Sequence, residues 1–272
     1  MTTPATTRRM LMPIVMDDPS RAAASLLRSF LAKSSNAVAF TGAGISTESG
    51  VPDFRSPGSP WLEHMPVDFA DFIASPLARI EAWRRKFAMD DLYAGARPGR
   101  GHKVLAHFVE TGKLAGIITQ NIDGLHAASG VGPEKIVELH GNGTYAACLT
   151  CHGRHELVDV RARFEAGGQA PACSCGGMVK SATISFGQAM PREPMRRAQA
   201  LTQACDLFLA IGSSLSVQPA ASFPALARQG GARLVIINRE PTPLDALADL
   251  CLRGEIGPLL EPFLARENFL PE

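Results

Sequence analysis

Four of the six cysteines lie in two close pairs that could together bind one metal ion. Two residues separate Cys148 from Cys151, one separates Cys173 from Cys175, and about twenty residues lie between the pairs. This arrangement is typical of a structural zinc site, in which four thiolates fill a tetrahedral shell and leave no position for a reactive water. The alternative is a set of reduced, buried thiols. We expect Cys148, Cys151, Cys173 and Cys175 to bind one structural Zn²⁺.

His140 directly follows a short apolar run, residues 135–139, of the kind that forms a buried strand. Asn121 and Asp123 come just after another such run, residues 114–119. An imidazole with an ordinary pKa of about 6.5 suits general-base chemistry near neutral pH. His140, Asn121 and Asp123 are therefore the candidate catalytic residues. Surface or capping roles are expected for the histidines in helical or loop patterns, which are His64, His102, His107 and His126.

A glycine turn follows the first apolar run, residues 37–40. Gly42 and Gly44 would let the backbone turn tightly and approach a pyrophosphate closely. The third glycine of a dinucleotide fingerprint would fall at position 47, which is Thr47. The sequence therefore argues against an ordinary hydride-transfer domain.

The loop after this turn places a carboxylate, an aromatic ring and a guanidinium in three consecutive residues. These are Asp53, Phe54 and Arg55, and Gly50 and Pro52 restrict the backbone that presents them. Together they could hydrogen-bond to, stack on and neutralise parts of a charged ligand. The alternative is a solvated ion pair on a turn.

Five apolar runs, separated by helical patterns, indicate the elements that position these residues. The runs are residues 37–40, 114–119, 135–139, 207–211 and 233–237. Strands that alternate with helices predict an α/β fold with a doubly wound parallel sheet, and continuous apolar runs fit strands covered on both faces. Ligands of such sheets bind at the carboxyl ends of the strands. Every run is followed by small or hydrogen-bonding residues, so we expect one ligand site at this edge.

Two stretches interrupt the alternation and indicate a smaller inserted lobe. Residues 55–100 carry no strand run, and residues 145–180 contain the cysteine cluster. We expect a mobile leader over residues 1–19 and a Rossmann-like sheet domain made of residues 20–54, 101–144 and 181–272. The insertions would be a helical cofactor loop over 55–100 and a zinc-binding module over 145–180. Cys205 and Cys251 lie in apolar runs and are expected in the core.

Composition limits the class of protein. Of 272 residues, 46% are hydrophobic and 19% charged, which is too apolar for a disordered chain. The formal net charge of +1 predicts neither a nucleic-acid coat nor a membrane-surface patch. Polar residues and prolines interrupt the longest uncharged stretch, residues 207–227, so it is a poor membrane span. No signal peptide is visible, and we expect a cytoplasmic protein.

With these motifs in order, the chain resembles the sirtuins, the bacterial-type NAD-dependent protein-lysine deacylases. The matching segments are residues 42–46, 52–56, 119–126, 139–141, 186–187, 212–215 and 238–240, together with the four cysteines. The resemblance extends over about residues 20–263, nearly everything but the leader. The resemblance implies an enzyme that cleaves NAD, transfers an acyl group from a protein lysine to ADP-ribose and releases nicotinamide.

The resemblance also implies where NAD binds. The glycine turn would hold the pyrophosphate, residues 120–123 the nicotinamide and its ribose, and residues 238–240 the adenosine, while His140 would activate a ribose hydroxyl. The expected NAD-binding residues are Gly42, Ala43, Gly44, Asp53, Phe54, Arg55, Gln120, Asn121, Ile122, Asp123, Gly212, Ser213, Ser214, Asn238, Arg239, Glu240 and Ile256.

Several positions depart from the pattern of the family. Ser185 stands where an aromatic residue is common and Gln188 where Glu is common, in the segment expected to pair with the substrate peptide. Ser213 replaces a common Thr and keeps its hydroxyl. Relatives that prefer acidic acyl groups carry Tyr and Arg where this chain has Trp83 and Lys86. The resemblance therefore favours an acetyl or another neutral acyl group.

Other functions remain open from the residues alone. Mono-ADP-ribosyl transfer to a protein would use the same cleavage of NAD with a different acceptor. A non-catalytic NAD-sensing or zinc-mediated binding module is a third reading, against which the presence of Asn121, Asp123 and His140 argues. A nucleic-acid-binding zinc ribbon is disfavoured, because its segment mixes arginines with acids and lacks interleaved aromatic residues. The expected partner is an acyl-lysine protein.

Overall fold

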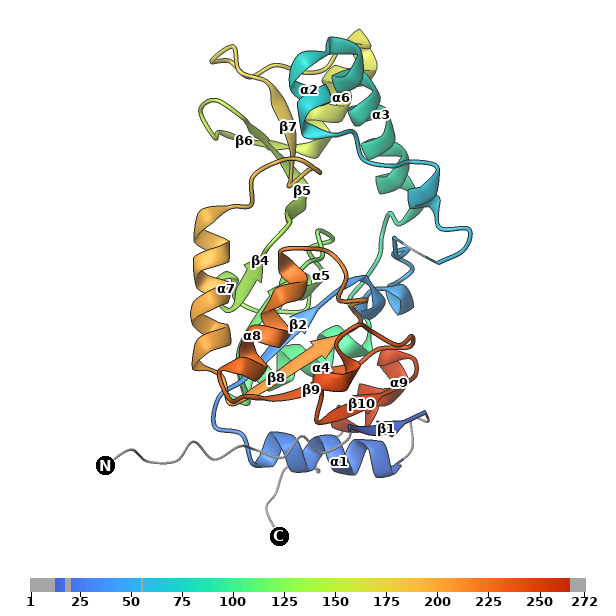
Figure 1. Ribbon diagram of the computed structural model, residues 1–272. Coiled ribbons are helices and arrows are strands. Elements are labelled where there is room, and N and C mark those ends of the chain that lie inside the picture. Colours follow the sequence, from blue (N-terminus) through green and yellow to red (C-terminus); the bar gives the residue numbers. More distant parts are fainter. Residues whose placement is uncertain (1–12, 18–20, 55, 265–272) are drawn as a thin grey trace, which may run out of the picture.

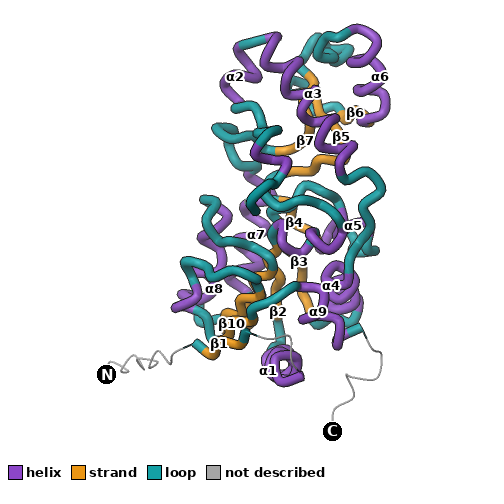
Figure 2. The backbone as a smooth tube through the Cα atoms, turned by 90° about the vertical axis from the view of Figure 1, so that its right-hand side faces the viewer, coloured by secondary structure: helices purple, strands orange, loops and turns teal. Residues whose placement is uncertain are grey.

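The structure, a computed structural model, describes residues 13–17, 21–54 and 56–264. A larger lobe is built on a seven-stranded sheet, and a smaller lobe is built on a three-stranded sheet (Figure 1). A quarter turn of the molecule shows the smaller lobe stacked on the larger one, with loop segments between them (Figure 2).

The large sheet is parallel throughout and has the order β1-β10-β9-β8-β2-β3-β4. Its strands are β1 (Ile14–Met16), β2 (Ala37–Thr41), β3 (Leu114–Thr119), β4 (Ile136–Glu138), β8 (Leu207–Ile211), β9 (Arg233–Ile237) and β10 (Leu250–Leu252). All residues of the two central strands, β2 and β8, are buried. Alternate residues face opposite sides: Val38 and Phe40 pack on one face, Ala37 and Ala39 on the other.

Helices cover both faces of this sheet, which confirms the doubly wound α/β fold. One face packs against α1 (Arg21–Ala32), α4 (Arg100–Glu110) and α9 (Ile256–Leu260). The other packs against α7 (Arg192–Ala204) and α8 (Phe223–Gln229). The apolar residues of α1 recur at helical spacing, and this places Leu27, Phe30 and Leu31 on its buried side.

The five apolar runs form strands at the expected places, but two further strands of the large sheet were not expected. β10 and β1 have three residues each, too few to show a periodic pattern. Within the leader expected over residues 1–19, Ile14–Met16 forms a strand that pairs in parallel with β10. This apolar, partly β-branched tripeptide extends the edge of the sheet. The other leader residues lie mostly outside the described part of the chain.

Both insertions contribute to one small lobe. Its elements are α2 (Phe69–Ala74), α3 (Pro76–Leu92), β5 (Gly141–Cys148), β6 (Arg154–Glu156), α6 (Leu157–Gly167) and β7 (Val179–Thr183). The strands form an antiparallel sheet of order β6-β5-β7. Trp83 and Phe87 from α3 pack with Ala146, Val160 and Val179 in a separate core. The helical insertion and the cysteine-bearing insertion therefore depend on each other for burial of apolar surface.

The first residues of α3 explain why this helix starts where it does. Ser75 accepts a hydrogen bond from the backbone N–H of Ala78 at 3.2 Å, and Pro76 occupies the first helical position. Both features favour a helix N-terminus. Among the described residues, no helix is long and apolar enough to cross a membrane.

Candidate active site

One cavity of about 710 Å³ opens at the carboxyl ends of the parallel strands, facing the small lobe. It is lined by all the described residues that were expected to bind NAD or to act in catalysis. These are Gly42, Ala43, Gly44, Asp53, Phe54, Gln120, Asn121, Ile122, Asp123, His140, Gly212, Ser213, Ser214, Asn238, Arg239, Glu240 and Ile256. Arg55 lies outside the described residues. Residues from five strand ends thus meet in one cavity.

The glycine turn packs directly against the backbone of the turn after β8. The N–H of Gly44 donates to the carbonyl of Gly212 at 2.8 Å. A Cβ atom at Gly42 would lie 2.7 Å from that same oxygen, and one at Gly44 would lie 2.8 Å from the Cα of Gly212. Close packing of the two backbones therefore requires glycine at both positions, whether or not a ligand also approaches them.

Asn121 and Asp123 are held by the hydroxyl of one serine, Ser46. The amide of Asn121 donates to the carbonyl of Gly42 at 3.1 Å and to the Ser46 Oγ at 3.2 Å. Ser46 in turn donates to Asp123 Oδ2 at 2.6 Å, and the N–H of Leu125 donates to Oδ1 at 2.9 Å. Both candidate side chains are therefore fixed before any ligand binds.

Two buried histidines lie beneath this network, where surface or capping roles had been expected. His102 Nδ1 accepts the N–H of Gly99 at 3.3 Å, so it does cap α4, but the residue is fully buried and its Nε2 lies 3.4 Å from Ser46 Oγ. His126 is buried too, and its Nε2 lies 2.9 Å from Thr41 Oγ1. Burial, with a contribution from the His102 charge, lowers the pKa of His126 to about 3. The surface expectation for His126 is wrong because Asp123 and Leu125 turn this short segment inward.

The geometry of His140 suits a general base. Its Nδ1 lies 3.0 Å from the carbonyl oxygen of Gln120, which can only accept a hydrogen bond. Nδ1 therefore carries the proton, and Nε2 keeps a free lone pair. Burial holds the pKa of His140 below its usual value, although the hydrogen bond to Gln120 opposes this effect. The imidazole is thus neutral and able to take a proton near neutral pH.

The residue after His140 joins the base to the small lobe. Gly141 has a φ of +72°, and a Cβ atom there would lie 2.1 Å from the carbonyl oxygen of Ala182. Only glycine fits, because β5 begins at this residue and runs tightly along β7. The N–H of Ile184, just beyond β7, donates to the carbonyl of His140 at 2.8 Å. The segment after β7 is therefore anchored directly to the candidate base.

Further hydrogen bonds link the strand ends across the cavity. Gln120 Nε2 donates to Ser213 Oγ at 2.8 Å, which joins the end of β3 to that of β8. Arg239 after β9 pairs with Glu255 at 3.3 Å and donates to Ser56 Oγ at 3.4 Å. The loop that contains Ser56 is thereby tied to the sheet.

The same loop is ordered by its own side chains. Asp53 accepts hydrogen bonds from the backbone N–H of Ser56 at 2.7 Å and from its hydroxyl at 2.6 Å. Phe54 is 40% exposed and stacks on Trp61 with ring centroids 4.3 Å apart. An aromatic ring is therefore presented toward the cavity with one face already packed.

Helix α3 places Lys86 at the cavity wall, where Asp90 neutralises its charge. The sequence analysis singled out Lys86 but neither Asp90 nor Tyr93. The Lys86 ammonium bonds to both carboxylate oxygens of Asp90, and the Tyr93 hydroxyl donates to Asp90 at 3.3 Å. Burial lowers the pKa of Lys86 and raises that of Tyr93. Trp83, which is also buried, lines the cavity beside them. This wall carries little net charge.

Lys180 is a cavity residue that no sequence signal indicated. It is 4% exposed, and its ammonium donates to the backbone carbonyls of Thr183 at 2.6 Å and Ser181 at 3.3 Å. No ion pair to Lys180 is found within the described part of the chain. Burial lowers its pKa to about 8. Its position in the cysteine-bearing insertion gave no reason to expect it at the cavity.

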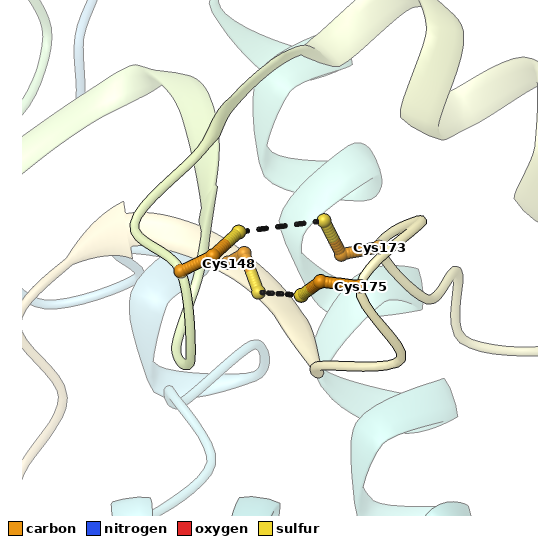
Figure 3. Close-up of side chains that lie close together, drawn as sticks. Cys148, Cys173 and Cys175 are labelled. Atoms are coloured by element: carbon orange, nitrogen blue, oxygen red, sulfur yellow. Dashed lines mark hydrogen bonds between the residues drawn. The ribbon is translucent and has the colours of Figure 1, made fainter.

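The four cysteines of the small lobe come together as expected. Their sulfur atoms all lie within 4.8 Å of one another, with Cys148 and Cys175 at 3.5 Å and Cys151 and Cys173 at 3.7 Å. Figure 3 shows Cys148 facing Cys173 and Cys175 across the gap between two loops. Tetrahedral Zn²⁺ with Zn–S bonds of about 2.3 Å requires sulfur separations of about 3.8 Å. The thiolates therefore fit one structural Zn²⁺. Cys205 and Cys251 are buried, as expected.

Comparison with known proteins relates this arrangement to one family. The model of the Sir2 family matches residues 42–219. A relative from Rhodopseudomonas palustris, named NAD-dependent protein deacetylase, is 57% identical over 239 residues, covering 88% of this chain and 94% of its own. Another, from Bradyrhizobium diazoefficiens and named NAD-dependent protein deacetylase 1, is 56% identical over 245 residues, covering 90% and 96%.

A solved structure shows the same fold with ligands bound. It contains a Sir2 protein with a peptide and NAD⁺, and it matches with a TM-score of 0.76 and 34% identity. The match covers 88% of this chain and 95% of the other.

Proposed function

The chain belongs to the Sir2 family, and we infer that it is an NAD-dependent protein-lysine deacylase, above all a deacetylase. One observation of its own structure carries this conclusion. A single cavity at the carboxyl edge of the sheet collects the glycine turn, the fixed Asn121 and Asp123, and a neutral His140. That set of residues can bind a dinucleotide and remove a proton from its sugar.

We propose that NAD lies across the strand ends. The pyrophosphate would lie at the closely packed turns of Gly42 and Gly212, and the adenosine would lie beside Asn238 and Ile256. The nicotinamide and its ribose would face Asn121 and Asp123. Phe54 and Asp53 would close the loop side of the cavity. What supports this assignment is the continuous lining of one cavity by all of these groups.

The proposed reaction uses the free lone pair on His140 Nε2 as the base. The carbonyl oxygen of the acyl-lysine attacks C1′ of the ribose, and the C–N bond breaks so that nicotinamide leaves with the electron pair. His140 Nε2 then takes the proton of a ribose hydroxyl, and the 2′ oxygen attacks the acyl carbon. After water enters, the products are free lysine and O-acyl-ADP-ribose. The hydrogen bond to Gln120 keeps the proton on Nδ1, so Nε2 remains the base throughout.

The wall contributed by α3 supports a preference for neutral acyl groups. Lys86 is already paired with Asp90, so its positive charge is compensated before substrate arrives. A carboxylate at the end of an acyl chain would therefore compete with Asp90 for Lys86, and it would lose its hydration for little gain. Trp83 adds apolar surface beside the pair. We propose acetyl and other short uncharged acyl groups as substrates.

The zinc module supplies structure to the small lobe and no catalytic group. Its four thiolates would complete the coordination shell, which leaves the metal no position for substrate or water. We further propose that residues 20–54, 101–144 and 181–272 form the NAD-binding domain, with 55–100 and 145–180 as its inserted lobe. Zinc-binding thiols must stay reduced, which supports the proposed cytoplasmic location.

A panel of acyl-peptides, assayed with and without NAD, tests this function directly. We expect nicotinamide release that depends on an acetyl-lysine peptide and equals the amount of lysine deacylated. His140→Ala should abolish deacylation while NAD and zinc still bind, as measured by calorimetry and metal analysis. Full turnover by this variant would refute the role of His140. A partner protein that gains ADP-ribose without losing an acyl group would show mono-ADP-ribosyl transfer instead.

A further inference from the structure

A second hollow, of about 450 Å³, lies between helices α7 and α8, outside the NAD cavity. The two helices run side by side on one face of the sheet (Figure 1). We call this hollow the α7–α8 groove. Its apolar lining is Met190, Met195, Phe223 and Leu226, and its polar lining includes Arg192 and Arg196.

The apolar lining is partly exposed. Phe223 is buried and forms the floor as part of the core, and Met195 packs against the same core. Leu226, in contrast, is 44% exposed although it stands beside this floor. An exposed leucine that continues a buried apolar surface into a hollow provides a place where a further apolar side chain can pack.

The charge on the rim is positive. Arg192 is exposed, and within the described part of the chain its guanidinium has no hydrogen bond or ion pair. Arg196 pairs with Glu193 at 2.8 Å. Among the described residues, no acidic side chain lines the groove. Arg192 also stands in the first turn of α7, where a positive charge is unfavourable to the helix, so stabilisation of α7 does not explain it.

The groove continues the surface on which the acyl-lysine chain would lie. Met190 lines both the groove and the NAD cavity. The preceding residues, 184–188, are the expected edge for the substrate peptide, and Ile184 is bonded to His140. Extended chain advances about 3.3 Å per residue. A peptide that leaves the cavity past Met190 therefore reaches the groove within several residues of the acyl-lysine.

We propose that the α7–α8 groove binds a second segment of the same protein substrate, carrying an apolar side chain next to a carboxylate. The apolar side chain packs on Phe223 and Leu226, and the carboxylate pairs with Arg192. This inference rests on the proposed function, because it names what kind of acyl-lysine protein the enzyme selects. The groove thus lets the enzyme select its protein substrates by residues outside the acyl-lysine itself.

The test compares acetyl-lysine peptides that differ only in one flank. One peptide carries Leu-Glu pairs four to seven residues before the acetyl-lysine, a second carries them after it, and a third has Ser in place of Leu and Glu. We expect one of the first two to show a KM about five- to tenfold below that of the third, with kcat unchanged. Fluorescence anisotropy of labelled peptides measures the same preference as binding, independently of turnover.

Variants that introduce a negative charge locate the effect. Leu226→Glu and Arg192→Glu are at exposed positions, and each should remove the flank preference while leaving the serine-flanked peptide unaffected. Leu77→Glu and Arg84→Glu are matched controls, because both residues are exposed on α3 and neither lines the groove. They should keep the preference.

The outcomes separate this inference from the proposed function. Equal KM and equal binding for all three peptides would overturn the groove assignment while leaving deacylation intact. Equal loss of preference in the α3 controls would also overturn it. Absence of turnover with every peptide would refute the proposed function. Peptide binding measured by fluorescence anisotropy would then test the groove assignment alone. If the wild type is a dimer that Leu226→Glu converts to a monomer, the groove is a contact between copies and the proposal is wrong.

Discussion

The hydroxyl of Ser46 donates a hydrogen bond to Asp123 at 2.6 Å, although the two residues are 77 positions apart in the chain. The same oxygen accepts the amide of Asn121 and lies near Nε2 of His102. A single buried hydroxyl therefore positions both polar side chains that would face the nicotinamide ribose.

Replacing this hydroxyl tests whether the positioning matters. Ser46→Ala should lower kcat/KM by about 10- to 100-fold, because Asn121 and Asp123 each lose a buried partner worth about 1–3 kcal/mol. Initial rates with an acetyl-peptide and varied NAD measure this. Ser49→Ala is the matched control, since the Ser49 hydroxyl is buried without a hydrogen-bond partner in the described structure. Equal activity of both variants would argue against the role of Ser46.

The pH profile tests the protonation state of His140. Burial lowers the pKa of this imidazole, and only its neutral form can accept a proton. Activity should therefore persist as the pH falls below about 6.5 and decline only as it passes through the lowered pKa. The acid limb of kcat/KM, measured between pH 4.5 and 8 in buffers of constant ionic strength, checks this. An acid limb above pH 6.5 that belongs to His140 would contradict it.

Burial of His126 makes stability depend on pH. Its pKa is about 6.5 when the chain is unfolded and about 3 when it is folded. Below pH 6.5 the unfolded chain binds the additional proton, so the stability due to neutral His126 is lost as the pH falls from 6.5 toward 3. By pH 5 the loss is about 2 kcal/mol.

Urea unfolding at pH 7.5 and at pH 5 measures this loss. His126→Gln should show a smaller difference between the two pH values than the wild type, whatever its stability at pH 7.5. His107→Gln, on α4, provides a histidine control. A wild-type stability that is equal at both pH values would rule out the predicted linkage.

Removal of zinc should unfold the small lobe. The cysteine loops and α3 share one core through Val179 and Trp83, so loss of the metal should expose that tryptophan. In a Trp61→Phe background, chelation should shift the remaining tryptophan emission to longer wavelength and abolish activity, and added Zn²⁺ should restore both.

Metal analysis completes this test. Cys173→Ser should lower the zinc content well below one ion per chain, whereas Cys205→Ala, which alters a core cysteine away from the cluster, should retain it. Unchanged fluorescence and activity in a chain shown to lack zinc would contradict a structural role.

The pairing of Lys86 with Asp90 predicts a change of acyl preference. Asp90→Asn keeps an oxygen acceptor but leaves the Lys86 charge uncompensated at the cavity wall. We expect kcat/KM for a succinyl-peptide to rise about tenfold relative to an acetyl-peptide, a change of about 1.4 kcal/mol. Lys86→Met/Asp90→Asn, which lacks the charge, should show no such rise. Equal ratios in the wild type and in Asp90→Asn would contradict the proposed compensation.

The parts of the fold that could be predicted from the sequence are those with long, unbroken apolar patterns. Runs such as residues 114–119 and 207–211 are buried on both faces, and parallel strands necessarily bring their carboxyl ends to one edge. The site residues after those strands therefore gather without any knowledge of distant contacts. Strands β1 and β10 were missed because three residues show no period.

The network beneath the site could not be predicted because it depends on tertiary contacts. His102 and His126 are buried by contacts between distant segments: α4 packs against β3 and α5, and His126 contacts Thr41 and His102. Lys180 belongs to an inserted segment whose strand returns to the cavity from the small lobe. Nothing in local composition distinguishes such residues from solvated ones.

A hydrogen bond between two distant segments couples the proposed substrate-binding edge to the candidate base. The N–H of Ile184 donates to the carbonyl of His140, so the segment proposed to pair with the substrate is joined by a backbone hydrogen bond to the residue that carries the imidazole. A poorly fitting peptide that displaces this edge also misaligns the base. If residues 184–188 pair with the substrate as proposed, a poorly matched protein should both bind more weakly and react more slowly once bound.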